Sequence, residues 1–157
     1  MPQLVKGGKY IFGWSHVSDT GRICIPEEAR EEYKFRPFDK IVIMSGSKTS
    51  KGFSITKKDL IKDCVIYNKL SSYKELINFQ ELPNGYIKDK DKIYTWSEVD
   101  ADGHFKISEE ILKQYNIKLK ENVLVGRGSG FALAFIKTGS IVKEAINHSE
   151  LIVYNEP

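Results

Sequence analysis

An internal repeat is the sequence feature that most constrains how this chain folds. Residues 17–33 read V-S-D-T-G-R-I-C-I-P-E-E-A-R-E-E-Y, and residues 99–115 read V-D-A-D-G-H-F-K-I-S-E-E-I-L-K-Q-Y, aligned without a gap at an offset of 82 residues. The same offset places Trp14 opposite Trp96. Such self-similarity indicates two copies of one structural unit. A unit of roughly 50 to 60 residues buries only a marginal core, so we expect the two copies to pack against each other.

The repeated segment predicts a turn, a short strand and a short helix. In the first copy, Asp19 and Gly21 favour a backbone reversal, because Asx side chains and a glycine at positive φ both stabilise turns. Ile23 and Ile25 alternate with more polar residues, which is the period of a strand with one buried face. Pro26 and the two glutamates after it are typical of a helix N-terminus.

The rest of the chain is interpreted around these two copies. Strands are predicted at 9–17, 22–25, 40–44, 53–56, 93–99, 104–107, 123–125 and 131–135, and helices at 26–33, from about Lys57 with Thr56 as cap, from Ser108 as cap, and at 138–147. Residues 63–90 form a linker, in which 67–82 is ambiguous and helix is slightly preferred, and 88–92 are expected to be a solvated turn. The predicted organisation is a tail over 1–8, a first repeat over 9–62, the linker over 63–90, a second repeat over 91–147 and a tail over 148–157, of which 151–154 form a strand or pack as coil.

Composition sets only broad limits. The net charge is +3, with 41% hydrophobic and 29% charged residues, which is ordinary for a globular protein and permits nucleic-acid binding without requiring it. No apolar run approaches the roughly 20 residues of a membrane span, and the first residues lack the apolar core of a signal peptide, so we expect a cytoplasmic protein without membrane contact. Cys24 and Cys64 are interpreted as reduced, small apolar residues.

No pattern in the sequence predicts catalysis, a metal site or a cofactor. His16, His104 and His148 lack the spacing of metal ligands and are interpreted as ordinary surface or rim residues. The glycine-rich run 126–130 lacks the Lys-Ser/Thr ending of a phosphate-binding loop and is predicted to be a hairpin turn. The two tryptophans at equivalent positions are most simply core or barrel-closing residues. We therefore expect a binding protein and not an enzyme.

The first copy resembles the AbrB/SpoVT swapped-hairpin superfamily, whose pattern runs V-D-x-x-G-R-I-x-I-P. The matching residues are Val17, Gly21, Arg22, Ile23, Ile25 and Pro26. Ser18 stands where the family has Asp, whereas the second copy keeps Asp100 but has His104 in place of the Arg. The resemblance implies a β-rich α+β protein in which two AbrB-like repeats form a pseudo-symmetric swapped-hairpin β-barrel with short helices. A tandem pair resembles the MraZ-like members, in which one chain carries both units.

The resemblance also implies a function, since most members of the superfamily are DNA-binding transcription regulators. Arg22 and Arg30 match family arginines that contact DNA, and arginine suits both phosphates and guanine edges. The densest basic cluster of the first repeat adds candidate phosphate contacts at Lys48, Lys51, Lys57 and Lys58.

Structural alternatives remain for each of these groups. Arg22 is equally consistent with an ion pair to Asp19 or a nearby glutamate, and Arg30 with a pair to Glu27 on its own helix. The lysine cluster is also consistent with a solvated loop that binds no phosphate. The acidic helix favours an alternative function, a protein- or ligand-binding module on the same barrel that has lost DNA binding. The expected partners are DNA and a possible protein partner, with the chain acting as a monomeric pseudo-dimer or a homo-oligomer.

Overall fold

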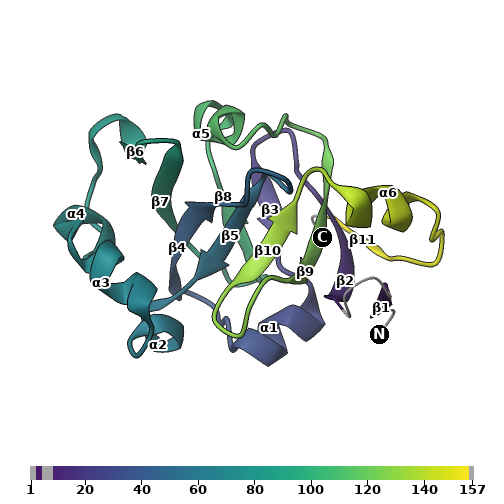
Figure 1. Ribbon diagram of the computed structural model, residues 1–157, viewed down its shortest axis with the longest axis horizontal. Coiled ribbons are helices and arrows are strands. Elements are labelled where there is room, and N and C mark those ends of the chain that lie inside the picture. The colour runs from purple at the N-terminus through teal and green to yellow at the C-terminus, as the bar shows by residue number, and fades with distance from the viewer. Residues whose placement is uncertain (1–2, 5–8, 156–157) are drawn as a thin grey trace.

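The protein is a sheet-rich α+β protein with six α-helices, described by a computed structural model over residues 3–4 and 9–155 (Figure 1). The strands are β1 (Gln3–Leu4), β2 (Lys9–His16), β3 (Arg22–Cys24), β4 (Lys40–Ser45), β5 (Phe53–Thr56), β6 (Ile87–Asp89), β7 (Lys92–Glu98), β8 (His104–Lys106), β9 (Asn122–Arg127), β10 (Leu133–Ile136) and β11 (Val153–Tyr154). The helices are α1 (Glu27–Tyr33), α2 (Lys58–Ile61), α3 (Val65–Ser71), α4 (Lys74–Ile77), α5 (Glu109–Gln114) and α6 (Ser140–Ile146), with a 3-10 turn at Pro83–Gly85.

The two repeats contain the same elements in the same order. In each repeat a long strand, a short strand, a helix and a hairpin follow one another, as β2-β3-α1-β4-β5 and as β7-β8-α5-β9-β10. The equivalent pairs β3 and β8, and β4 and β9, begin and end at residues related by the sequence offset. The hairpin loop between β4 and β5 is longer than the one between β9 and β10, which shifts the offset of the last strand.

Strands of one repeat pair with strands of the other. The first strand of each repeat lies against the hairpin of its counterpart, β2 antiparallel to β9 and β7 antiparallel to β4, and the hairpins meet where β5 pairs with β10. Trp14 pairs with Leu124, and the equivalent Trp96 pairs with Val42. The two copies therefore form one body through strand pairing between them, and their packing together is what the size of a single copy predicts.

The hydrogen-bonded strands form an open path among the described residues. Their order is β1-β2-β9-β10-β5-β4-β7-β6, with β11 parallel to β2, while β3 and β8 form a separate two-stranded ribbon. The α+β, β-rich part of the predicted fold class is confirmed. Closure into a swapped-hairpin barrel stays a prediction, since backbone hydrogen bonds do not join the described strands into a ring.

The main core lies between the sheet and the ribbon and draws residues from both repeats. Phe53 and Phe135 stack with ring centroids 4.8 Å apart. Phe105 of the ribbon meets both rings edge-on at 6.0 and 5.6 Å. Aromatic pairs in these geometries add to the stabilisation from burial. Removal of either repeat would expose this aromatic cluster, so the core is shared.

The other face of the sheet carries two smaller apolar clusters. Helices α2 to α4 cover β4 and β7, where Trp96 packs near Val42, and α6 covers β2 and β9, where Trp14 packs near Leu124. Figure 1 shows these two groups of helices at opposite ends of the sheet. Both tryptophans are half-buried in these outer clusters and do not lie in the main core, although they occupy equivalent positions as predicted.

Several predicted boundaries are wrong for local reasons. The N-cap of α2 is Lys57, because the Thr56 hydroxyl instead donates to the Phe131 carbonyl at 2.6 Å. The slight preference for helix over 67–82 is confirmed in part, since α3 begins before this segment, at Val65, and the one-turn α4 lies within it. The predicted solvated turn over 88–92 is confirmed at residues 90–91, which are exposed and join β6 to β7, whereas its other residues belong to those strands.

The structure tests the predicted cap of the second repeat helix and parts of both predicted tails. Ser108 caps α5, as predicted, by accepting a hydrogen bond from the Ile111 amide. Residues 153–154 form β11, which confirms the strand alternative for the C-terminal tail. In the predicted N-terminal tail, residues 3–4 form β1, and the remaining positions of 1–8 lie outside the described residues, as do 156–157.

Candidate functional site at the paired turns

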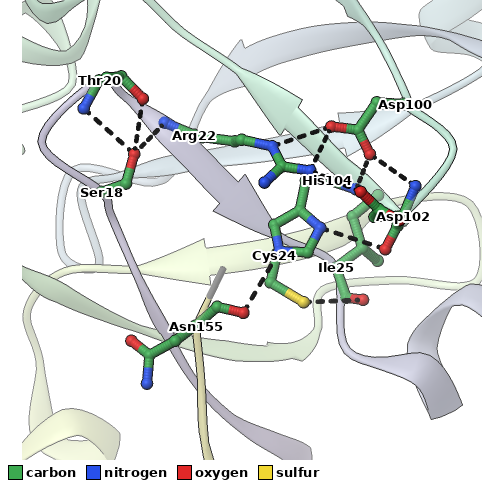
Figure 2. A network of polar contacts seen from close by, with 9 residues as sticks. All are labelled: Ser18, Thr20, Arg22, Cys24, Ile25, Asp100, Asp102, His104 and Asn155. Atoms are coloured by element: carbon green, nitrogen blue, oxygen red, sulfur yellow. Dashed lines mark hydrogen bonds and ion pairs between the residues drawn. The ribbon is translucent and has the colours of Figure 1, made fainter. Parts of the chain in front are cut away.

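The ribbon of β3 and β8 joins two equivalent turns, which are shown in Figure 2. In the first turn the Ser18 hydroxyl accepts hydrogen bonds from the backbone amides of Thr20 and Arg22, at 3.2 and 2.9 Å. In the second turn one oxygen of Asp100 accepts from the equivalent amides of Asp102 and His104, at 2.9 and 3.0 Å. Ser18 therefore holds the first turn as Asp100 holds the second, but without a negative charge.

Arg22 is held across the ribbon by two carboxylates of the second repeat. Its Nε and Nη2 atoms lie 3.0 and 2.9 Å from Oδ2 of Asp100, and Nη2 lies 3.2 Å from Oδ2 of Asp102. The side chain is 24% exposed. The alternative that pairs this arginine within the protein is thus supported, although its partners are not Asp19 or a glutamate. One cation between two anions leaves this part of the surface without positive charge.

Asp100 is the centre of this network. Partial burial on its own would raise the pKa of its carboxyl group, but hydrogen bonds from the His104 and Asp102 amides and from Arg22 outweigh it and lower the pKa below the ordinary value. The carboxylate is therefore charged at neutral pH and serves two purposes. It stabilises its own turn and it links the two repeats through Arg22.

His104 occupies the position equivalent to Arg22 and is buried, with 3% of its surface exposed. Its Nδ1 lies 3.1 Å from the Asp102 carbonyl oxygen, and its Nε2 lies 3.3 Å from the Asn155 carbonyl oxygen (Figure 2). The interpretation of this histidine as a surface or rim residue is wrong, because it is buried and contacts Asn155, the residue that follows β11. Its alignment with Arg22 in the repeat did not indicate that the histidine is buried.

The cysteines behave as small apolar residues. Cys24 is buried beside His104 in the ribbon and Cys64 is half-buried in the linker, and both are free thiols. Burial raises the pKa of the Cys24 thiol, which keeps it protonated and unreactive. No group of three His, Cys, Asp or Glu side chains that could hold a metal ion occurs within residues 3–4 and 9–155.

Arg30 packs against the second turn and does not project freely from α1. A Cβ atom added to Gly103 would lie 2.3 Å from an Arg30 guanidinium nitrogen, so a larger residue there would displace the guanidinium. The buried Nε atom of Arg30 has no hydrogen-bond partner among the described residues. The predicted ion pair of Arg30 with Glu27 is not formed among these residues. Arg30 is half-buried, and its stem serves packing between the two repeats.

The four candidate lysines divide into two kinds. Lys48 and Lys51 are exposed in the β4–β5 loop, where the Lys48 ammonium lies 3.8 Å from a carboxylate oxygen of Asp91. Lys57 is structural, since its ammonium contacts Asp39 at 2.8 Å and its side chain is only 13% exposed. The Lys58 ammonium lies 5.1 Å from the centroid of the Phe79 ring, a cation–π contact.

The six predicted DNA contacts do not share one surface. Helix α1 precedes β4 and helix α2 follows β5, so both lie at one end of this antiparallel pair, whereas the loop with Lys48 and Lys51 lies at the other end (Figure 1). The exposed face of α1 is acidic, with glutamates at 27, 28, 31 and 32. Glu32 is held by Arg127 in a two-bond ion pair with distances of 2.5 and 2.8 Å.

Comparison with known proteins assigns no family to the chain. Neither the models of protein families nor the curated proteins contain a match to the sequence. Within the part of the chain that the structure describes, every helix is too short or too polar to cross a membrane.

Proposed function

We propose that this chain is a cytoplasmic DNA-binding transcription regulator of the AbrB/SpoVT type, in which one chain supplies both halves of a pseudo-symmetric swapped-hairpin barrel. The observation that carries the proposal is the exchange of strands between repeats, β2 with β9 and β7 with β4. This pairing is the arrangement that the sequence resemblance implies.

Lysines, and not the ribbon arginine, are the proposed phosphate contacts. Lys48 and Lys51 are the exposed members of the predicted set and lie on one loop. Arg22 is neutralised by two carboxylates and Lys57 is bound to Asp39, so neither offers a free charge to DNA. Lysine ammoniums on a loop contact the phosphate backbone without reading bases.

Salt dependence of DNA binding tests this proposal. Binding of the full chain to labelled genomic fragments is measured by fluorescence anisotropy over a series of salt concentrations. The logarithm of the association constant should fall steeply with the logarithm of salt. A double variant, Lys48→Ala with Lys51→Ala, should reduce the slope by about two, one for each lost phosphate contact. Lys143→Ala, an exposed lysine on α6, is the matched control and should leave the slope unchanged. Absence of binding at low salt, or a flat salt response, would overturn the proposal.

The second candidate is a protein- or ligand-binding module that has lost DNA binding. The observation that favours it is the neutralised turn, since Arg22 lies between Asp100 and Asp102. Asp102→Asn separates the two functions, because it removes one negative charge and leaves the backbone amide of residue 102 in the turn. An increase in DNA affinity in this variant, with none detectable for the natural chain, would support the module over the regulator.

A further inference from the structure

The outer face of the sheet has a hollow between its two apolar clusters. One row of side chains crosses the sheet in register, as Tyr94 beside Met44, Met44 beside Ser54, and Ser54 beside Ala134. The next residue of the row, paired with Ala134, is Gly126, which has no side chain. Small residues thus occupy the middle of the row, where the hairpins of the two repeats meet.

Neither group of helices covers this part of the sheet. The apolar cluster under α2 to α4 includes Met44, Tyr94, Ile66 of α3 and Phe131. Ala134 belongs to the other cluster, under α6. The space between has a volume of about 360 Å3 and is lined by residues of both hairpins. Pockets for small molecules occupy roughly 300 to 1,000 Å3 and are mostly apolar with a few polar groups.

The polar lining of the hollow is cationic. Lys51 and Lys92 line it, and none of the described lining residues carries a carboxylate. The Lys92 ammonium is placed by the Gly46 carbonyl, which it contacts at 3.4 Å. Asp91 is the carboxylate of the adjoining hollow, and it lies beside Lys48. Lys51 and Lys92 also border that adjoining hollow, but neither forms an ion pair with a described residue, and two such ammoniums next to an apolar surface favour an anion.

The Ser54 hydroxyl adds a polar group on the sheet surface itself. It lines the hollow and makes no hydrogen bond to another described residue. The hydroxyl groups of Ser45 and Ser129, by contrast, accept hydrogen bonds from the backbone amides of Ile93 and Phe131. Ser54 can therefore donate to a bound group without loss of an existing contact.

We propose that this hollow between the hairpins binds a small amphipathic anion, with a carboxylate or phosphate group at Lys51 and Lys92 and a compact apolar body against Met44, Phe131 and Ala134. Ser54 donates a hydrogen bond to the bound molecule. The site shares Lys51 with the loop proposed to contact DNA, but its test uses no nucleic acid, so it can succeed or fail whether or not the chain binds DNA.

Methionine methyl NMR of the full chain tests this site directly. The chain has two methionines, Met1 and Met44, and Met44, the methionine among the described residues, lines the hollow, so 13C-methyl labelling gives a reporter signal in the site. The probes are hexanoate, hexyl phosphate and, as a neutral control, hexanol. Hexanoate or hexyl phosphate should shift the Met44 signal and bind at least about tenfold more tightly than hexanol. The tighter of the two anions identifies the head group as carboxylate or phosphate.

Variants separate a specific site from general binding. Lys51→Ala with Lys92→Ala should weaken binding of the anion by about tenfold or more, because both charge-assisted contacts are lost. Lys88→Ala, an exposed lysine of β6 outside the hollow, is the matched control and should bind as the natural chain does. Equal affinity for hexanol, unchanged binding in the double variant, or no Met44 shift at about 10 mM of either anion would overturn the proposal.

Discussion

Arg22 of the first repeat and Asp100 of the second form an ion pair across the ribbon, with Nη2 2.9 Å from Oδ2. The same carboxylate accepts the amide hydrogen bonds that hold its own turn. Local turn geometry and contact between the repeats therefore depend on one side chain. Because the pair is partly exposed, most of its contribution comes from the hydrogen bonds and little from the charges alone.

Asp100→Asn should lower stability in a pH-dependent way. Hydrogen bonds lower the pKa of Asp100 in the folded chain, so the unfolded chain takes up this proton first as pH falls. The stabilisation is present above the unfolded pKa of about 3.9 and is lost as pH falls through the folded pKa. Urea unfolding at several pH values should show the natural chain more stable than Asp100→Asn by about 1 kcal/mol near neutral pH, with the difference vanishing in acid.

Ser18→Ala is the matched control for this prediction. Ser18 holds the equivalent turn with a hydroxyl group that does not titrate in acid. Its loss should cost a similar free energy of unfolding, about 1 kcal/mol, at every pH. A constant difference between the natural chain and Asp100→Asn down to acid pH would contradict the assignment.

Alanine at the turn glycines should have graded effects on stability. At Gly21, φ is +81° and a Cβ would lie 2.1 Å from the Ile107 carbonyl oxygen, so Gly21→Ala should cost about 2 to 4 kcal/mol. At Gly103, φ is similar but the obstructing group is the flexible end of Arg30, so the cost should be smaller. Gly130→Ala meets nothing within 4 Å and should be neutral. Thermal unfolding of the three variants gives this order, and equal melting temperatures for Gly21→Ala and Gly130→Ala would refute it.

Two equivalent ion pairs should contribute similarly to stability. Lys57 binds Asp39, and Lys137 binds Glu121. In each hairpin the lysine follows the second strand and the carboxylate precedes the first. Both carboxylates also accept a backbone amide, from Arg36 and Lys118 respectively. Each carboxylate would lose a partner in a partly buried place, so Lys57→Met and Lys137→Met should each cost about 1 to 3 kcal/mol in urea unfolding.

An exposed lysine tests whether these effects come from the ion pairs. Lys62 is exposed next to α2, and Lys62→Met should change the free energy of unfolding by no more than about 0.5 kcal/mol. Comparable losses in all three variants would mean that loss of charge in general, and not the two pairs, sets stability.

The repeat made much of the fold predictable from sequence. The turn, strand and helix of each copy follow local rules, such as Ser108 accepting the amide hydrogen bond at the start of α5. The need of a small unit for a shared core predicts that the two copies pack together. The linker was not predictable in detail, because α3 and α4 are short helices that depend on packing against β7 and carry no periodic pattern of their own.

The candidate site was less predictable, because it depends on contacts between distant residues. Asp100 and Asp102 are 78 and 80 positions from Arg22, and no local pattern indicates that they neutralise it. The same holds for Lys57, whose partner Asp39 is brought close only by the return of the hairpin. Ser18 and Asp100 occupy equivalent positions in the two copies of the turn motif. This difference is the one sequence feature that could have indicated that the negative charge lies on the second turn.

Tyr33→Phe should lower the free energy of unfolding at neutral pH. It should also make that free energy fall less steeply as the pH rises. The Tyr33 hydroxyl donates to the carbonyl oxygens of Ser129 and Ala132, at 2.7 and 3.1 Å, and so joins α1 to the β9–β10 loop. Burial first, and then the nearby Glu32, raise the pKa of Tyr33 to about 12. The stabilisation is complete below the unfolded pKa of about 10 and is lost as pH rises toward the folded value. Urea unfolding should show a deficit of about 1 kcal/mol for Tyr33→Phe at pH 8 that shrinks in alkali, and parallel curves up to pH 12 would exclude this role.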